Sequence, residues 1–280
     1  MNFMQLVNGL ELGALYSLVA IAVYISFRVI NFADLTVDGS FPLGGAVLSI
    51  LVINDVNYII ALLASVASGM VAGFVTAYLN VRHKIFDILA GILTMTALYS
   101  INLRIMGRPN IALMDDILPA DVSLLIVPVI ALSVAILVIL FLKTQIGLAL
   151  ISVGQNPVLA ESCGIDTSGM KILALAISNG LVALAGGLFV LKQGFADISI
   201  GTGTIIIGLA SVIIGTKLLS SKSISLTIIG IFIGSIIYRL FVALALNIDF
   251  IGLEPSDLNL ISSLLVAFTM IFPTLSRLRK

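Results

Sequence analysis

The sequence predicts an all-α protein whose helices cross a membrane. Hydrophobic residues make up 60% of its 280 residues and charged residues only 10%, whereas a soluble domain carries about 25% charged residues. The interior of a chain of this length cannot hold so much apolar surface. The apolar residues also form long unbroken runs rather than the alternating pattern of a membrane β-barrel, so helices are the expected spanning elements.

Nine runs approach the length of about 20 apolar residues that a spanning helix needs. They lie near residues 5–27, 35–53, 58–79, 85–105, 122–142, 171–191, 203–219, 224–245 and 258–275. We expect them to form a single transmembrane domain over residues 1–280. Three G-x-x-x-G pairs predict close helix packing, either within one chain or between copies; they are Gly9 with Gly13, Gly69 with Gly73, and Gly230 with Gly234.

The second run differs from the others. Residues 29–45 contain Asn31, Asp34, Asp38 and Pro42, a composition that a straight helix facing lipid would not tolerate. Irregular backbone at membrane depth survives only against protein or water. We therefore expect one broken or re-entrant segment that is buried inside the protein.

The basic residues predict the orientation, because Lys and Arg collect on the cytoplasmic side. Alternating the nine spans places most of the fourteen basic residues on one side. They are Arg28, Arg82, Lys84, Lys143, Lys171, Lys217, Lys222, Arg277, Arg279 and Lys280. The opposite connections are acidic and contain Asp55, Asp115, Asp116, Asp121, Asp197, Asp249, Glu254 and Asp257. The N-terminus is therefore expected outside and the C-terminus inside.

Composition argues against several classes of function. The net charge is zero, whereas nucleic-acid binding needs clustered Lys and Arg, so no nucleic-acid partner is expected. A single cysteine, Cys163, excludes an internal disulfide, and together with the single histidine, His83, it leaves no expected metal site. The chain also lacks the phosphate-binding loop G-x-x-x-x-G-K-[ST]. It is therefore not expected to hold ATP or another cofactor, or to be an enzyme.

One long connection contains the signals of a short helix. Residues 143–170 lie on the expected cytoplasmic side, and Asn156 and Pro157 within them form a helix start, because Asn can cap and Pro fits the first turn. The predicted helix covers residues 158–163 and is ended by Gly164. A plain linker would not carry this pattern, so a docking element is expected.

A second long connection, residues 106–121, is expected outside the membrane. It mixes prolines and an acidic pair with Ile and Leu, which predicts an amphipathic extracellular segment. It could belong to a gate or to a docking surface, or it could be an ordinary capped surface helix.

Polar residues within the expected spans are costly and are therefore candidates for a solute pathway. They are Asn31, Asp34, Asp38, Ser40, Thr94, Tyr99, Asn102 and Asn179. Those at the break could instead satisfy local backbone groups, and the others could bond between helices. Glu11 and Arg239 lie at comparable depths in the first and eighth spans, so a buried ion pair between them is a further candidate.

Two stretches resemble a known family, the permease subunits of branched-chain amino acid and ribose-type ABC importers. Its N-terminal signature is similar to residues Asn8, Gly9, Gly13, Tyr16, Leu18 and Ala20 and the run Ile30, Asn31, Phe32 and Ala33. Its coupling region is similar to residues Thr144, Gly147, Gly154, Asn156, Ala160, Gly164 and Ile165. Leu150 departs from the family, since many members carry a basic residue there. The fourth span looks closest to a sub-branch paired with solute-binding lipoproteins, some of them linked to aromatic amino acids.

The resemblance implies a homodimeric permease in a bacterial plasma membrane. The ATP and Mg would be bound by separate cytoplasmic ATPase subunits, and an extracytoplasmic solute-binding protein would supply a small organic solute such as an amino acid. The ATPase would dock on a coupling segment whose implied residues are Thr144, Gly147, Gly154, Asn156, Pro157, Ala160, Glu161, Gly164 and Ile165.

Two other classes of function remain to be compared with this one. A stand-alone secondary transporter could use Asp34, Asp38 or Glu11 as its proton carrier, and it would be expected to show inverted repeats with paired broken helices. The sequence shows one broken segment and no matching half. A membrane-embedded enzyme would need a catalytic constellation, and none is evident.

Overall fold

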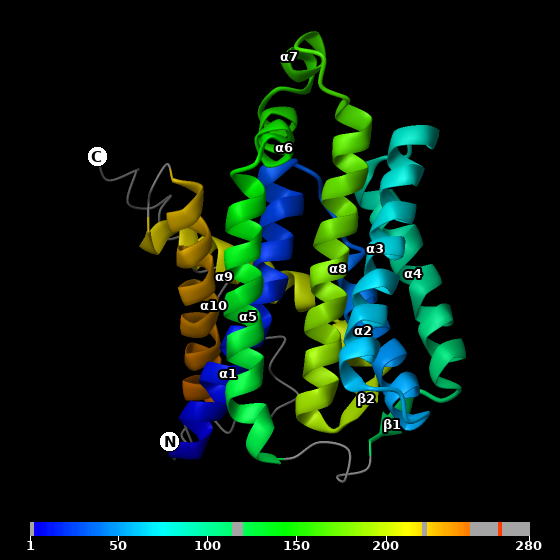
Figure 1. Ribbon diagram of the computed structural model, residues 1–280, viewed down its shortest axis with the longest axis vertical. Helices are drawn as coiled ribbons and strands as arrows, with labels where there is room; N and C mark the ends of the chain where they lie inside the picture. The colour runs from blue at the N-terminus through cyan, green and yellow to red at the C-terminus, as the bar shows by residue number, and fades with distance from the viewer. Residues whose placement is uncertain (1–2, 114–119, 220–222, 247–262, 265–280) are drawn as a thin grey trace.

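The computed structural model describes residues 3–113, 120–219, 223–246 and 263–264, and helices make up almost all of them (Figure 1). Six helices are long and apolar enough to cross a membrane: Leu6–Val29, Tyr58–His83, Asp87–Met106, Thr167–Gln193, Ile198–Leu218 and Ile224–Ala245. A seventh candidate is the pair Ile126–Leu142 and Gln145–Gln155, which is bent by 77°. The chain is therefore a polytopic helical membrane protein. Of the expected span at residues 258–275 only residues 263–264 are described, so the number nine stays a prediction.

The labels of Figure 1 follow the chain. The elements are α1 (Phe3–Val23), the π-helix η1 (Tyr24–Val29), α2 (Val37–Ile53), α3 (Tyr58–His83), α4 (Asp87–Met106), β1 (Asn110–Ala112), α5 (Ala120–Leu142), α6 (Gln145–Gln155), α7 (Pro157–Ser162), α8 (Thr167–Gln193), β2 (Phe195–Asp197), the 3₁₀ helix η3 (Ile198–Gly201), α9 (Thr204–Leu218) and α10 (Ile224–Leu246). The short helix α7 projects at one end of the molecule, and β1 and β2 lie at the other (Figure 1).

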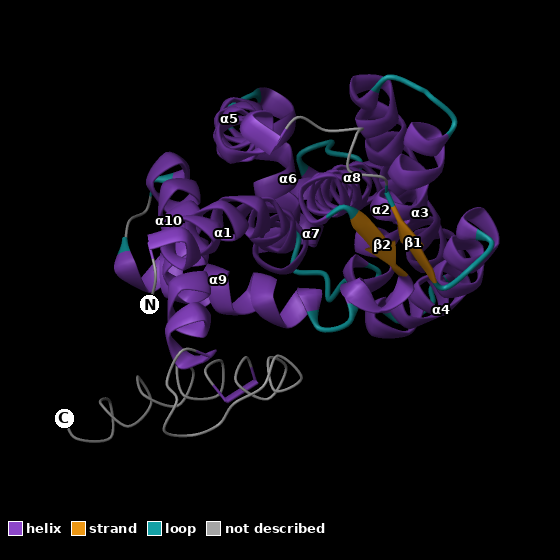
Figure 2. Cartoon of the chain, turned by 90° about the horizontal axis from the view of Figure 1, so that it is seen from below, coloured by secondary structure: helices purple, strands orange, loops and turns teal. Residues whose placement is uncertain are grey.

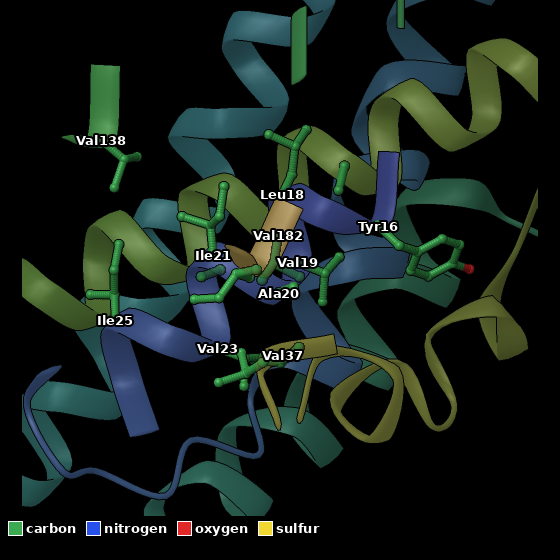
Figure 3. Close-up of a cluster of buried hydrophobic side chains, with 14 of the residues drawn as sticks. Tyr16, Leu18, Val19, Ala20, Ile21, Val23, Ile25, Val37, Val138 and Val182 are labelled. Atoms are coloured by element: carbon green, nitrogen blue, oxygen red, sulfur yellow. The ribbon is translucent and has the colours of Figure 1, made fainter. Parts of the chain in front are cut away.

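The core surrounds α1. Leu18, Ile21 and Val23 are fully buried, and Val182 of α8 and Val138 of α5 pack in the same cluster (Figure 3). Helices α5, α8, α9 and α10 all contact α1, and Figure 2 shows it between α10 and α8. A helix that is apolar on every side belongs in an interior of this kind.

The expected break is present but is shorter than residues 29–45. The chain leaves the helix after η1, Asn31 takes a left-handed conformation with φ of 54°, and α2 begins at Val37. Pro42 lies inside α2. The backbone is therefore irregular over residues 30–36 only, and the glycine-rich part that follows is helical because it packs against the neighbouring α3, α4 and α8.

The three G-x-x-x-G pairs pack within the chain. A Cβ at Gly73 of α3 would overlap the Leu175 carbonyl oxygen of α8. Gly13 of α1 meets the backbone of Ile236 in α10, and Gly234 of α10 meets that of Gly215 in α9. Small residues thus bring these helix backbones together, and the close packing predicted from the sequence is intramolecular.

The connection after α4, which the sequence predicts to be extracellular, contains a strand rather than a helix at its described end. Gly107 ends α4 with φ of 69°, and β1 then pairs antiparallel with β2, with Ile111 opposite Ala196. Residues 114–119 lie outside the described residues. The sequence could not show this pairing, because a strand of three residues has too few positions for a period and its partner is far along the chain.

Candidate coupling surface and solute pathway

The predicted short helix is present as α7. The Asn156 side-chain Oδ1 accepts a hydrogen bond of 3.1 Å from the Leu159 N–H, and Pro157 occupies the first turn. Gly164 takes a left-handed conformation with φ of 81°, and Asp166 caps α8 by accepting from the Ser168 N–H at 3.1 Å. Each boundary of α7 is thus fixed by residues within a few positions of it.

The surface of α7 is apolar as well as exposed. Val158 is 74% exposed and Leu159 61% exposed, whereas Ala160 is buried against the body of the protein. Glu161 lies on the exposed side. Exposed apolar side chains next to a polar rim are typical of a protein interaction surface, and α7 presents them at the outermost point of the described chain (Figure 1).

Helix α6 connects α7 to the break. The Thr144 side chain caps α6 by accepting from the Gly147 N–H at 3.3 Å. Further along, a Cβ at Gly154 would overlap the Val29 carbonyl oxygen and would also approach Ile30. Leu150 of the same helix is fully buried. The end of α6 therefore rests directly on the backbone that leads into residues 30–36.

A buried polar network holds the break and the start of α2. The Asp34 carboxylate accepts from the Thr36 N–H at 2.9 Å and from the Asn179 side-chain amide at 2.6 Å. The Asn179 Oδ1 in turn accepts from the Ser40 hydroxyl at 2.7 Å. Asp34, Ser40 and Asn179 are all fully buried. Three of the predicted pathway residues are thus brought together, and their polar atoms face one another.

The side chain of Asp38 bonds to a helix that lies far along the chain. Its carboxylate accepts from the Gly203 N–H at 3.1 Å and the Ile205 N–H at 2.8 Å, so it caps the N-terminus of α9. Pro42 has no N–H to donate to the Asp38 carbonyl, and Gly201 of η3 approaches that carbonyl so closely that a Cβ would overlap it. The proline in α2 therefore coincides with a close approach of η3.

A cavity of about 280 Å³ opens between α2, α4 and η3, and we name it the α2–α4 cavity. Its lining residues are Asp38, Gly39, Pro42, Met95, Thr96, Tyr99, Asn102, Ile198, Ser199 and Thr202. The Asn102 amide donates to the Gly39 carbonyl oxygen at 3.3 Å. Three further predicted pathway residues, Asp38, Tyr99 and Asn102, therefore share one cavity.

Two predicted pathway residues join neither group. Thr94 is buried, donates to the Ala90 carbonyl oxygen of its own helix at 3.0 Å, and lines a separate apolar groove of about 400 Å³ between α2, α3 and α4. Asn31 is exposed at the turn that ends η1. Its left-handed backbone, which Asn tolerates better than most residues, gives it a local role.

The predicted ion pair between Glu11 and Arg239 is not formed. Glu11 pairs instead with Lys192 near the end of α8. The Arg239 guanidinium lies over the ring of Tyr16, 4.3 Å from its centroid, and its Nε has no hydrogen-bond partner among the described residues. Similar depth in two spans was not enough to predict pairing, because the long Lys192 side chain reaches Glu11 from a third helix.

Sequence reasoning also missed a contact that fixes the break to α3. The hydroxyls of Thr36 and Thr76 lie 2.7 Å apart and both residues are fully buried. No sequence signal distinguishes this pair from other threonines in apolar runs.

Within the residues that the structure covers, no three His, Cys, Asp or Glu side chains gather in a way that could hold a metal ion.

Sequence comparison decides the family. The profile of the branched-chain amino acid transport system permease component matches residues 5–273. This chain belongs to that family. The tyrosine transport system permease protein of Clostridioides difficile is 35% identical to this permease over 253 residues, which cover 89% of this chain and 85% of the relative. An uncharacterized protein of Rickettsia prowazekii is 33% identical over 186 residues, which cover 64% of this chain and 65% of the relative. The resemblance to ABC importer permeases is thereby confirmed.

The permease also shares its fold with a solved protein. A chain in the structure of PsaBC from Streptococcus pneumoniae in complex with Fab aligns with a TM-score of 0.59, and the alignment covers 96% of this permease and 91% of that chain. The two sequences are 16% identical, so the likeness concerns the fold alone. Family and spanning helices together make this chain a multi-pass transport subunit of a membrane.

Proposed function

We propose that this permease is the membrane-spanning subunit of an ABC importer and that two copies form the translocation pathway. Separate cytoplasmic ATPase subunits bind ATP and Mg, and the permease itself catalyses no reaction. The α7 end faces the cytoplasm of a bacterial cell and the β1–β2 end faces outward, where a solute-binding protein docks. This orientation follows the basic residues of the connections, among which Lys84 and Lys171 lie together in one pocket.

The observation that carries the proposal is the arrangement of α7, α6 and the break. The exposed apolar helix α7 offers the ATPase a docking surface. Gly154 places the adjacent helix α6 against Val29 and Ile30. Movement of α7 can therefore reach residues 30–36 through the close backbone contact of α6 at Gly154. A lone docking helix without that contact would bind a partner but would have no direct route to the pathway.

The proposed cycle uses this route. ATP binding closes the ATPase pair and carries each α7 inward, and α6 transmits the movement to the break. The break is bonded to α8 through Asp34 and Asn179, and the start of α2 is bonded to α9 through Asp38. The two copies then change their opening from inside to outside, and ATP hydrolysis resets them.

The proposed cargo is an amino acid with an aromatic side chain. One relative that aligns along most of both chains is named a tyrosine transport system permease. The candidate pathway residues are polar but mostly uncharged, which suits a zwitterionic solute. A solute-binding protein would supply most of the selectivity by delivering only its own ligand.

A stand-alone proton-coupled transporter fits the geometry less well. Asp34 and Asp38 each accept two hydrogen bonds that hold the backbone of the break and of α9, and Glu11 is paired with Lys192. A proton carrier must release and rebind its proton in each cycle. For Asp34 and Glu11 this would break buried contacts to other helices, and protonation of Asp38 would weaken the cap of α9.

The test is to express the permease with the ATPase and solute-binding protein of the proposed importer and to reconstitute the purified complex in liposomes. We expect uptake of radiolabelled L-tyrosine that requires both ATP and the loaded binding protein and that is insensitive to a protonophore. Uptake by the permease alone, driven by a proton gradient, would overturn the proposal.

A further inference from the structure

Asn102, which is among the residues that line the α2–α4 cavity, carries a buried hydrogen-bond acceptor that has no partner among the described residues. Asn102 is fully buried, its amide nitrogen donates to the Gly39 carbonyl oxygen, and its Oδ1 has no hydrogen-bond partner within the described residues. The reverse orientation of this amide would place two acceptors together, so Gly39 fixes which atom is left over. A buried acceptor without a partner is unfavourable, and a ligand that donates a hydrogen bond would relieve this.

The same cavity contains a second acceptor, the Asp38 carboxylate. Its two oxygens each accept one backbone N–H from the start of α9. An ionised carboxylate has about four acceptor positions, so Asp38 can accept further bonds from the cavity. None of the lining residues is Lys or Arg, so no protein cation answers this charge from within the lining. An ammonium group, which offers three donors and one positive charge, complements Asp38 and Asn102 together.

The remaining lining residues indicate what the ammonium is attached to. Met95, Pro42, Ile198 and the ring of Tyr99 give the cavity apolar walls, and Thr202 lies exposed on the η3 side. Its volume of about 280 Å³ is near the lower end of the ~300–1,000 Å³ that small-molecule sites occupy. These dimensions suit a primary amine with an apolar or aromatic body of amino-acid size.

We propose that the α2–α4 cavity is a solute subsite of the permease, in which Asn102 Oδ1 and the Asp38 carboxylate bind the ammonium group of the solute. The proposal rests on the proposed import function and assigns a chemical class to part of its pathway. Asp38 also caps α9, and Asn102 also holds Gly39 near the start of α2. The solute would thus bind at the segment that α6 contacts from its other end.

The test measures occupancy at the cavity itself. Cys163 is the single cysteine, so a Cys163→Ser background with Thr202→Cys carries one thiol at the cavity. The permease–ATPase complex is labelled with a maleimide in the presence of L-tyrosine, of tyramine, which lacks the carboxylate, or of 3-(4-hydroxyphenyl)propanoate, which lacks the ammonium. We expect L-tyrosine and tyramine to slow labelling and the deaminated acid to have no effect at the same concentration.

Asn102→Leu should raise the tyramine concentration that gives half-protection by about tenfold, the value of one hydrogen bond to a charged group. Asp38→Asn keeps an acceptor for α9 but removes the charge, and it should raise the same tyramine concentration. This variant replaces Asn102→Leu as the test if Asn102→Leu fails to assemble with the ATPase. Thr94→Val is the matched control on α4, because Thr94 is buried but lies outside this cavity. The tyramine concentration that gives half-protection should be the same in Thr94→Val as in the parent.

Equal protection by all three compounds, or protection that Asn102→Leu and Asp38→Asn leave unchanged, would overturn the subsite. ATP-driven tyrosine uptake measured on the same preparations separates this outcome from failure of the import function. Uptake without selective protection refutes the subsite and leaves the importer intact. Selective protection by tyramine without any ATP-driven uptake supports an ammonium site and refutes the proposed function.

Discussion

The proposed coupling region, residues 143–170, and the break at residues 30–36 are neighbours, but they are held by different kinds of contact. Asn156 caps α7 three residues away and Asp166 caps α8 two and three residues away. At the break, Ser40 bonds to a residue 139 positions away and Asp38 to one 167 positions away. The first region is therefore locally determined and largely exposed, whereas the second depends on the whole bundle. A locally built helix can move as a unit and transmit force to a segment that cannot fold alone.

Substitutions at two glycines of the proposed coupling region, Gly154 and Gly164, should differ most in their effect on transport. Gly154 faces the Val29 carbonyl oxygen, whereas Gly164 has open space around it and only a left-handed φ of 81°. Gly154→Ala is expected to lower ATP-driven uptake roughly tenfold or more, because overpacking by one methyl costs ~1–3 kcal/mol at a tight contact. Gly164→Ala is expected to cost only about 1 kcal/mol of local strain.

Both glycine variants are measured as solute transported per ATP hydrolysed in liposomes. ATPase activity that persists in Gly154→Ala while transport falls would identify Gly154 as the junction between the two regions. Equal coupling ratios in the two variants and the parent would show that the α6 contact with Val29 transmits nothing.

The next largest effect is expected when the polar network of Asp34, Ser40 and Asn179 is disrupted, and it is an effect on the free energy of unfolding. Asn179→Leu leaves Asp34 and Ser40 with unpaired buried groups and should lower the free energy of unfolding by about 3 kcal/mol. The neighbouring Ser178 donates to the Ala22 carbonyl oxygen at 2.9 Å, and Ser178→Ala should cost only about 1 kcal/mol. Denaturation in mixed micelles measures both, and equal losses would mean that the network is no more than a set of ordinary hydrogen bonds.

The partner of Glu11 can be tested by a double-mutant cycle. Glu11→Gln with Lys192→Gln should show a coupling energy of roughly 1–3 kcal/mol, the range for groups in contact. Glu11→Gln with Arg239→Gln should be additive within about 0.5 kcal/mol. The opposite result would restore the pairing predicted from the sequence and would place Lys192 elsewhere.

The smallest expected effect is the pH dependence of stability at the β1–β2 end of the molecule. Partial burial alone would raise the pKa of Asp197, but hydrogen bonds from Ser199 and Asn110 hold that pKa below its usual value of 3.8. A lowered pKa stabilises the fold above the unfolded value and loses that stabilisation as the pH falls through the folded pKa. The melting temperature of the protein minus that of Asp197→Asn should therefore be constant near neutral pH and shrink below about pH 4. A difference that does not change with pH would contradict this.

The coupling region could be predicted because its signals are local. An Asn and a Pro at one end of α7, with Gly164 at the other, fix the helix whatever surrounds it, and the sequence predicted its bounds within a residue. The position of the break could also be predicted, since three polar residues and a proline interrupt an apolar run. Its true extent could not, because Gly39, Gly44 and Gly45 become helical only where α4 and α8 approach them.

The partners of the polar residues could not be predicted for the same reason. Asp34, Ser40 and Asn179 were each identified as candidates, but periodicity places a residue on one face of a helix and says nothing about which helix lies opposite. Lys192 was overlooked as the partner of Glu11 because it lies near the end of a span, where a basic residue needs no special explanation. The strand β1 was missed because β2, its partner, follows it only after four intervening helices.

The central claim is that α7 docks the ATPase and that this docking drives transport. Leu159→Glu places a charge in the exposed apolar surface of α7, and Ile53→Glu is the control, because Ile53 is also exposed and apolar but ends α2 near the β1–β2 end of the molecule. The decisive measurement is the amount of ATPase that copurifies with each variant. We predict that Leu159→Glu loses most of the bound ATPase together with ATP-driven tyrosine uptake and that Ile53→Glu retains both. Full retention of the ATPase by Leu159→Glu would contradict the account.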